Sequence, residues 1–152
     1  MIELSQLSCD FARSERRTAH LLLVEDDETD VLFVKRCLAK YGADIPLTIA
    51  RDGAEALEIL RSRENASHTH VILTDLNMPG VSGHELIEAI RADAALANSV
   101  IFVLSSSRLT GDIRRCYGFN IAGYLTKQRP PRELEKDIMM IFDYCTSVHL
   151  PT

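Results

Sequence analysis

The stretch LLLVEDD at residues 21–27 runs from an apolar, strand-like segment directly into three acids. Three later apolar runs also end in a polar side chain: VILT at 71–74 before Asp75, VIFVL at 100–104 before Ser105, and IAGYLT at 121–126 before Lys127. Longer segments with helical spacing separate these runs, which predicts βαβ crossovers and a parallel sheet. Because ligands bind outside the carboxyl ends of parallel strands, we expect the acids, the hydroxyl and the ammonium group at one rim.

Apolar periodicity predicts the helices and strands along the chain. Strands are expected at 21–24, 47–50, 70–74, 99–104 and 121–125, and helices at 28–41, from Asp52-Gly53 to about Arg63, at 85–92, 109–117 and 133–144. This alternation predicts an α/β fold, a three-layer sandwich that occupies residues 19–146. Residues 1–18 are expected to form a flexible polar arm, and residues 147–152 a C-terminal tail.

Composition argues against several classes of protein. The 152-residue chain has a formal net charge of −5, whereas nucleic-acid binders normally carry a basic face. No segment approaches the ~20 apolar residues of a membrane span, so no membrane association is expected. The cysteines lie far apart without a C-x-x-C pair, at positions Cys9, Cys37, Cys116 and Cys145. Reduced thiols in a cytoplasmic protein are therefore expected.

The predicted rim offers the oxygen ligands that Mg²⁺ prefers. Asp26 and Asp75 can bind the ion directly and Glu25 through water, while the backbone carbonyl of Asn77 can complete the protein ligands. A magnesium site is therefore expected where the first and third strands end.

The same rim suits the transfer of a phosphoryl group, which needs alignment and neutralisation of charge on the equatorial oxygens. Lys127 and the Ser105 hydroxyl would meet the group from sides that the metal does not occupy. Asp75 would be the nucleophile that accepts it, forming an acyl phosphate.

Four segments in order resemble the motif set of response-regulator receiver domains: LLVEDD at 22–27, LTDLNMPG at 73–80, VLSSS at 103–107 and YLTK at 124–127. The resemblance implies a flavodoxin-like fold with a five-stranded parallel sheet in the order 2-1-3-4-5. It implies that Glu25 and Asp26 form the acidic pair and that Asp75 is the phosphoacceptor. Family members commonly have proline after the lysine, where this chain has Gln128.

The same resemblance assigns roles to the remaining rim residues. Ser105 would be the switch hydroxyl, Tyr124 the switch aromatic, and Lys127 the lysine that contacts the phosphoryl group. Asn77 and Ser107 would tune autodephosphorylation, because these positions lie near the attacking water in the family.

A finer similarity is to small regulators that pair with bacterial phytochromes. It rests on RDGAEAL at 51–57 and HLP at 149–151, and it implies a homodimer assisted by the C-terminal segment. The expected function is that of a single-domain response regulator, a signalling protein with self-catalysed phosphotransfer, not an enzyme acting on a separate substrate. Its partners would be a sensor histidine kinase and a downstream phosphotransfer or target protein.

Two rival functions come from other classes. An aspartyl-phosphate hydrolase would need a second acid two residues after its nucleophile, where this chain has Asn77. A phosphorylation-independent interaction module would be expected to lose Asp75 or Lys127, and both are present.

The last predicted helix holds more apolar residues than one face on a sheet requires. These are Ile138, Met139, Ile141, Phe142 and Tyr144, followed by Val148, Leu150 and Pro151. Exposed apolar groups of this kind indicate a self-association surface, and a tail folded back on its own domain is the alternative.

Overall fold

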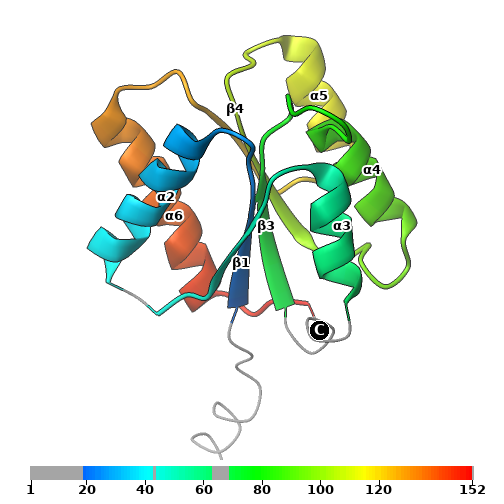
Figure 1. The fold of residues 1–152 in the computed structure, drawn as a ribbon, viewed down its shortest axis with the longest axis horizontal. Helices are drawn as coiled ribbons and strands as arrows, with labels where there is room; N and C mark the ends of the chain where they lie inside the picture. Colours follow the sequence, from blue (N-terminus) through cyan, green and yellow to red (C-terminus); the bar gives the residue numbers. More distant parts are fainter. Residues whose placement is uncertain (1–18, 43, 63–68, 152) are drawn as a thin grey trace, which may run out of the picture.

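The computed structural model describes residues 19–42, 44–62 and 69–151, and Figure 1 shows their arrangement. The arm predicted over residues 1–18 lies outside the described residues. A five-stranded parallel sheet forms the middle layer, in the order β2-β1-β3-β4-β5. Its strands are β1 (Ala19–Val24), β2 (Leu47–Ala50), β3 (Thr69–Thr74), β4 (Val100–Ser105) and β5 (Gly123–Thr126). The predicted flavodoxin-like strand order is confirmed.

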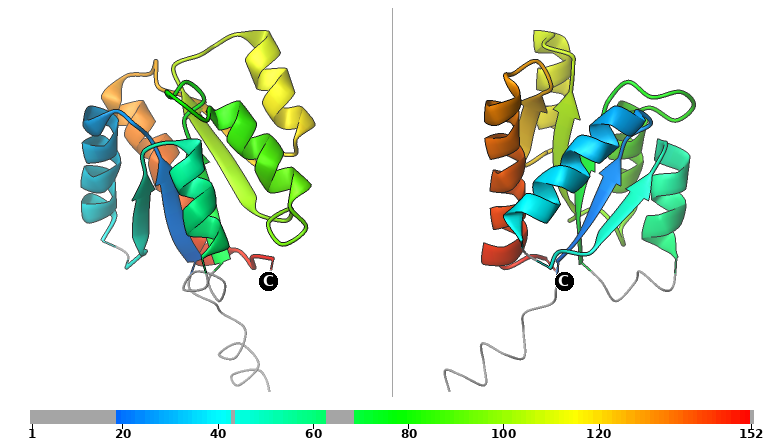
Figure 2. Two further views of the ribbon diagram at one scale, coloured as in Figure 1. Left: turned by 45° about the vertical axis from the view of Figure 1, so that its right-hand side comes forward. Right: turned by 60° about the vertical axis from the view of Figure 1, so that its left-hand side comes forward.

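Helices cover both faces of this sheet. They are α2 (Glu28–Tyr41), α3 (Gly53–Arg61), α4 (Gly83–Ala92), α5 (Thr110–Gly118) and α6 (Pro131–Ser147). Helices α2 and α6 lie together on one face, and α3, α4 and α5 cover the other, as Figures 1 and 2 show. Among the described residues, no helix has the length and apolar character needed to cross a membrane.

The central strands are apolar on both sides because both sides of the sheet are covered. In β1, Leu21 and Leu23 belong to the core beneath α2 and α6, whereas Leu22 and Val24 belong to the core beneath the other three helices. Val24 is paired with Thr74 in the register of β1 and β3. The residues that follow these strands therefore emerge side by side at the carboxyl edge of the sheet.

Helix boundaries on one face differ from the predictions for local reasons. α3 ends at Arg61 and not near residue 63, because the backbone N and the hydroxyl of Ser62 both donate to the Ile59 carbonyl, at 3.2 and 2.9 Å. α4 begins at Gly83, two residues before the predicted start. Ser82 is its N-cap, and the Ser82 hydroxyl accepts a hydrogen bond from the Glu85 amide at 3.3 Å.

Boundaries of β1, β5 and α6 also differ from the predictions. β1 begins at Ala19, two residues before the predicted start. β5 begins at Gly123 and not at residue 121, because the chain enters it through a turn in which Asn120 has a φ of 58°. α6 extends from Pro131 to Ser147, beyond the predicted 133–144, and the added last turn buries Cys145.

The predicted surplus of apolar side chains on the last helix is wrong. Ile138, Ile141 and Phe142 are fully buried, and Tyr144 packs edge-on against Phe102 with ring centroids 5.3 Å apart. The tail follows the alternative interpretation: Leu150 packs against the core, and the Pro151 carbonyl accepts from the Thr69 hydroxyl at 3.5 Å. Met140 and Val148 remain exposed, with 51% and 41% of their surface accessible.

Candidate functional site

Three carboxylates meet at the carboxyl edge of the sheet. Glu25 and Asp26 follow β1, Asp75 follows β3, and one ligand atom from each lies within 4.8 Å of the others. Strand pairing continues one residue beyond each strand, since the Glu25 amide donates to the Ala50 carbonyl at 2.9 Å and the Asp75 amide donates to the Val24 carbonyl at 3.0 Å. Glu25 and Asp75 are buried, whereas Asp26 is exposed. The backbone ladder therefore fixes the cluster, and one member faces solvent.

The Asp75 carboxylate is held by one backbone amide and one side chain. Its Oδ1 accepts from the Leu76 amide at 2.7 Å, and its Oδ2 accepts from Lys127 Nζ at 3.1 Å. Behind it, a Cβ at Gly83 would lie 2.0 Å from the Asp75 carbonyl oxygen, so a side chain there would force the backbone apart. The start of α4 is thus packed directly against the segment that carries Asp75.

Lys127 is bound by three carboxylates. Its Nζ lies 2.7 Å from Glu25, 2.7 Å from Asp30 and 3.1 Å from Asp75. Burial alone would lower the pKa of Lys127, but hydrogen bonds to Asp30 and Glu25 and the charges of Asp75 and Glu25 raise it above the ordinary value. The side chain is therefore a fixed positive charge beside Asp75.

Glu25 is the most perturbed acid of the cluster. Burial raises the pKa of Glu25 to about 7, and the Asp75 charge adds to this effect, while the hydrogen bond from Lys127 opposes it. Crowded carboxylates of this kind hold protons more tightly than isolated ones. A divalent cation among the three carboxylates would relieve the repulsion, and carboxylate oxygens suit a hard ion.

Ser105 is the last residue of β4, and Tyr124 belongs to β5, the strand that leads to Lys127. The Ser105 side chain is fully buried, and its Oγ accepts from the Ser107 amide at 3.2 Å. The amide of Lys127 donates to the Ser105 carbonyl at 2.9 Å, which fixes the lysine beside the end of β4. The Tyr124 hydroxyl donates to the Ser107 carbonyl at 2.7 Å.

Asn77 and Gln128 border the cluster. Asn77 is exposed, and its amide makes a long contact of 3.5 Å to Asp75 Oδ1. The Gln128 amide donates to the Thr126 hydroxyl at 3.2 Å, which closes the turn after β5. No cis peptide bond occurs in the described part of the chain.

The sequence interpretation missed Asp30 and Asp112. Asp30 lies in the first turn of α2, and its carboxylate contacts Lys127 at 2.7 Å. This contact depends on the orientation of α2, which the strand pattern does not predict. Asp112, in the first turn of α5, binds the Ser107 hydroxyl. The sequence separation between Ser107 and Asp112 gave no reason to expect this contact.

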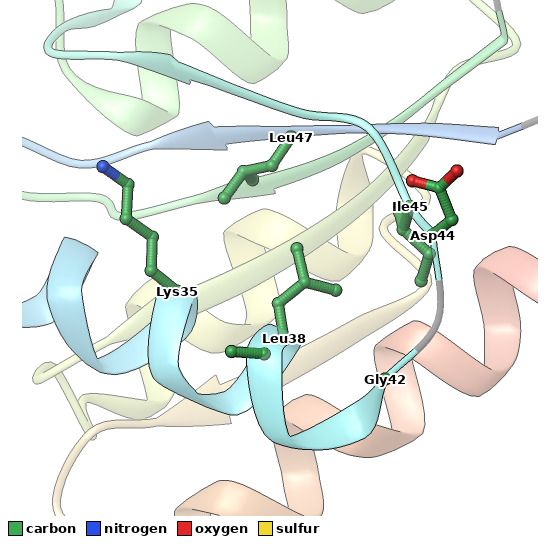
Figure 3. A pocket seen from close by; sticks show the side chains of 7 residues that line it. Lys35, Leu38, Gly42, Asp44, Ile45 and Leu47 are labelled. Carbon is green, nitrogen blue, oxygen red and sulfur yellow. The ribbon is translucent and has the colours of Figure 1, made fainter.

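A separate groove of about 500 Å³ lies between α2 and β2 (Figure 3). It is lined by Lys35, Leu38, Ala39, Gly42, Asp44, Ile45 and Leu47. These residues belong to the second half of α2, to the segment that connects it to β2, and to the first residue of β2, whereas the carboxylates lie where β1 ends and α2 begins. The groove is therefore not part of the acidic site.

Comparison with known proteins gives a consistent family. The sequence model of the response regulator receiver domain matches residues 21–139. Response regulator Rcp1 of Synechocystis sp. is 33% identical over 124 residues, which cover 80% of this chain and 84% of Rcp1. The probable methanogenesis regulatory protein FilR2 of Methanothrix harundinacea is 30% identical over 126 residues, 82% of this chain and 81% of FilR2.

Solved structures agree with this similarity. The phosphorylated cyanobacterial phytochrome response regulator RcpA is similar with a TM-score of 0.79 and 30% identity, over 90% of this chain and 100% of RcpA. The Mn²⁺-bound form of Rcp1 has a TM-score of 0.77 and 31% identity, over 89% of this chain and 99% of that one.

Proposed function

The chain belongs to the response regulator receiver domain family, and we propose that Asp75 is the residue on which it accepts a phosphoryl group from a sensor histidine kinase. The observation that carries this assignment is the contact between Asp75 Oδ2 and Lys127 Nζ, at 3.1 Å, inside the cluster with Glu25 and Asp26. A carboxylate beside a fixed ammonium group and further acids suits a nucleophile whose product carries more negative charge than the free side chain.

In the proposed step, a carboxylate oxygen of Asp75 attacks the phosphorus atom of phosphohistidine. The new O–P bond forms as the N–P bond breaks, and the electron pair of that bond stays on the imidazole nitrogen of the kinase, which takes a proton. Lys127 would neutralise charge on one equatorial oxygen, and the Ser105 hydroxyl would donate to another.

Magnesium is the proposed cofactor. Asp26 and Asp75 would bind it directly, Glu25 through water, and the Asn77 carbonyl would complete the protein ligands. When bound, the ion would neutralise negative charge of the three carboxylates and of the phosphoryl group, for which one lysine is not sufficient. A manganese-bound form of Rcp1, 31% identical to this chain, supports a divalent ion at such a site.

The return to the free carboxylate would follow attack by water on the acyl phosphate. Asn77 and Ser107 are the residues proposed to tune this step. In the intervening phosphorylated state, the Ser105 hydroxyl would turn toward the new oxygens and Tyr124 would respond as the second element of the switch.

The rival functions receive no support from the site. Hydrolase chemistry would place an acid two residues after Asp75, and the exposed Asn77 amide cannot exchange a proton in that role. A phosphorylation-independent module would have no need for Lys127 bound among acids. We therefore retain the phosphoacceptor as the function that the geometry supports best.

The proposed partner is a phytochrome-type histidine kinase, which would place the protein in the cytoplasm with ATP. RcpA is described as a cyanobacterial phytochrome response regulator, and AtBRR, 29% identical to this chain, as a bacteriophytochrome response regulator.

A homodimer is also proposed, through the exposed apolar groups Met140 and Val148. A further phosphotransfer or target protein would receive the signal.

The direct test is phosphorylation by acetyl phosphate with Mg²⁺, followed by intact mass. The protein is expected to gain one phosphoryl group, and Asp75→Asn none. Asp44→Asn is a matched control, because Asp44 is exposed and lines the groove at the other end of α2. Full phosphorylation of Asp75→Asn would refute the assignment. Transfer from acetyl phosphate but not from a phosphorylated phytochrome kinase would refute the partner alone.

A further inference from the structure

Side chains from four elements form one connected set around the loop between β4 and α5. Tyr124 of β5 donates to the Ser107 carbonyl at 2.7 Å, and the Ser107 hydroxyl donates to Asp112 Oδ2 in α5. Asp112 Oδ1 lies 3.3 Å from His84 Nε2 in α4, and His84 Nδ1 lies 3.9 Å from Cys116 Sγ. Ser107 is therefore held through both its carbonyl and its hydroxyl.

One end of this set is fixed relative to Asp75. His84 directly follows Gly83, whose backbone packs against the Asp75 carbonyl and whose amide donates to the Leu76 carbonyl at 3.0 Å. Because α4 cannot shift without moving the Asp75 segment, His84 gives Asp112 a fixed partner. Asp112 in turn gives the Ser107 loop a fixed partner.

The other end is the group that the switch would move. Tyr124 is half-buried, and its hydroxyl is bonded to the Ser107 carbonyl. The Ser107 amide also bonds the buried Ser105 hydroxyl. The position of the loop thus decides whether the Tyr124 hydroxyl keeps the Ser107 carbonyl as its acceptor.

We infer that Asp112 is a positioning residue that holds the Ser107 loop in the conformation that keeps Tyr124 bound, and that His84 supports Asp112 in this role. Asp112 is suited to it as a carboxylate: the Ser107 hydroxyl, and then His84, lower the pKa of Asp112 below its ordinary value. A charged acceptor makes the stronger type of hydrogen bond. This inference deepens the proposed function, since it concerns the switch of the same site.

The consequence is that the contacts of the loop bias the position of Tyr124. Loss of the Asp112 carboxylate removes a charge-assisted bond from the loop and is expected to change the ratio of bound to released Tyr124 by roughly tenfold. The Ser107→Ala variant removes the other partner of the same bond. The two substitutions together are therefore expected to do no more than either one alone.

The test uses the full chain labelled with 3-fluorotyrosine and ¹⁹F NMR, with Tyr124→Phe identifying the Tyr124 resonance. In Asp112→Ala and in Ser107→Ala, this resonance is expected to move toward the position of free fluorotyrosine, or to split into two. Asp112→Asn, which keeps the side-chain volume, is expected to give a smaller change in the same direction.

Arg115→Ala is the matched control. Arg115 also joins α5 to α4, through a contact of 2.7 Å with Glu88, and it interacts with Asp112 through charge and not through a hydrogen bond. Its removal is expected to leave the Tyr124 resonance in place. An equal shift in Arg115→Ala would mean that helix docking, not Asp112, positions the ring, and would overturn the inference.

Two further outcomes also decide the matter. An unchanged resonance in Asp112→Ala, or a double variant that shifts further than both single ones, would overturn the inference. Repeating the series in an Asp75→Asn background separates it from the proposed function. The shifts are expected to persist there, because the hydrogen bonds of the set do not involve the Asp75 side chain.

Discussion

Lys127 Nζ lies 2.7 Å from Asp30 Oδ2, a contact that joins the end of β5 to the first turn of α2. Lys127 also contacts Glu25 and Asp75, both of which belong to the proposed magnesium and phosphoryl site. Asp30 is therefore the acid that remains to hold the ammonium group when a metal ion and a phosphoryl group engage the other two.

Asp30→Ala is expected to slow the phosphorylation of Asp75 by acetyl phosphate about tenfold, because the ammonium group loses an anchor that keeps it in position. The rate can be followed by intact mass against time. Glu28→Ala removes the same charge from the same helical turn, but Glu28 pairs with Arg51 and not with Lys127. Equal rates in the two variants would show that Asp30 acts only through net charge.

Asp26→Ala is expected to weaken Mg²⁺ binding by at least about tenfold, since a direct carboxylate ligand is lost. Isothermal titration calorimetry with Mg²⁺ measures the change. Glu58→Ala, an exposed acid on α3, is the control for the lost charge. An unaltered titration curve in Asp26→Ala would exclude Asp26 as a ligand.

Most of the fold could be read from the sequence because buried parallel strands have a direct signature. The strands flanked by helices on both faces are short apolar runs, and LLLV of β1 is one of them. The residues that follow strands could be assigned to one edge for the same reason. The contact of Asp30 with Lys127 was missed, because it depends on how α2 is oriented and not on a strand ending.

The C-terminal region shows a different limit of sequence reasoning. A count of apolar residues in a helix does not show how many neighbouring elements the helix packs against. Phe142 and Tyr144 contact different elements around the same core. Phe142 lies against Tyr41 of α2, and Tyr144 lies against Phe102 of β4. The buried face of α6 includes more residues than contact with the sheet alone requires, because α6 packs against both α2 and the sheet.

Arg91→Ala is expected to lower the free energy of unfolding by about 2–4 kcal/mol, because several backbone carbonyls lose a charged donor. The Arg91 guanidinium donates to the carbonyls of Phe119, Ala97, Ser99 and Asn120, at 2.7 to 3.1 Å. Ala97 and Ser99 lie in the loop before β4, and Phe119 and Asn120 lie in the loop after α5. Urea unfolding at neutral pH measures the loss.

Arg91→Lys tests the geometry of this contact, since an ammonium group cannot reach all these carbonyls from one point. Most of the stability loss is expected to remain in that variant. Arg61→Ala is the matched control, because its exposed pair with Asp93 at 3.1 Å contributes at most about 1 kcal/mol. A fully stable Arg91→Ala protein would contradict the assignment.

The thiols of Cys37, Cys116 and Cys145 are expected to react slowly with iodoacetamide in the folded protein. Burial raises the pKa of each thiol from 9.0 to about 11. At pH 8 this lowers the thiolate fraction roughly a hundredfold. The measurement uses the Cys9→Ala variant, with and without urea. Equal rates in both conditions would contradict the burial.

The same shifts predict a loss of stability in alkali. A thiol whose pKa is raised in the folded state stabilises it fully below pH 9, and this contribution disappears as the pH rises from 9 to 11. Urea titrations of Cys145→Ala are expected to show a weaker dependence on pH across that window than the parent protein shows.

Met140→Lys is expected to weaken the proposed homodimer, because Met140 on α6 and Val148, the residue directly after the helix, are both exposed apolar side chains. Sedimentation at roughly tens of micromolar measures the mass. Truncation after Tyr144 is a poorer test, since it removes the buried Cys145. Leu109→Lys is the control, because Leu109 is 69% exposed on another helix end. A parent protein that sediments as a monomer would refute the dimer.

The bond between the Thr69 hydroxyl and the Pro151 carbonyl has a practical consequence. It ties the end of the described chain to the first residue of β3, while Asp75 follows the last, about 20 Å away along the strand. A fluorophore or a biotin anchor attached after Pro151 would therefore report from the opposite pole of the molecule. Immobilised in this way on a sensor chip, the protein would present its acidic edge to a kinase in the flowing solution.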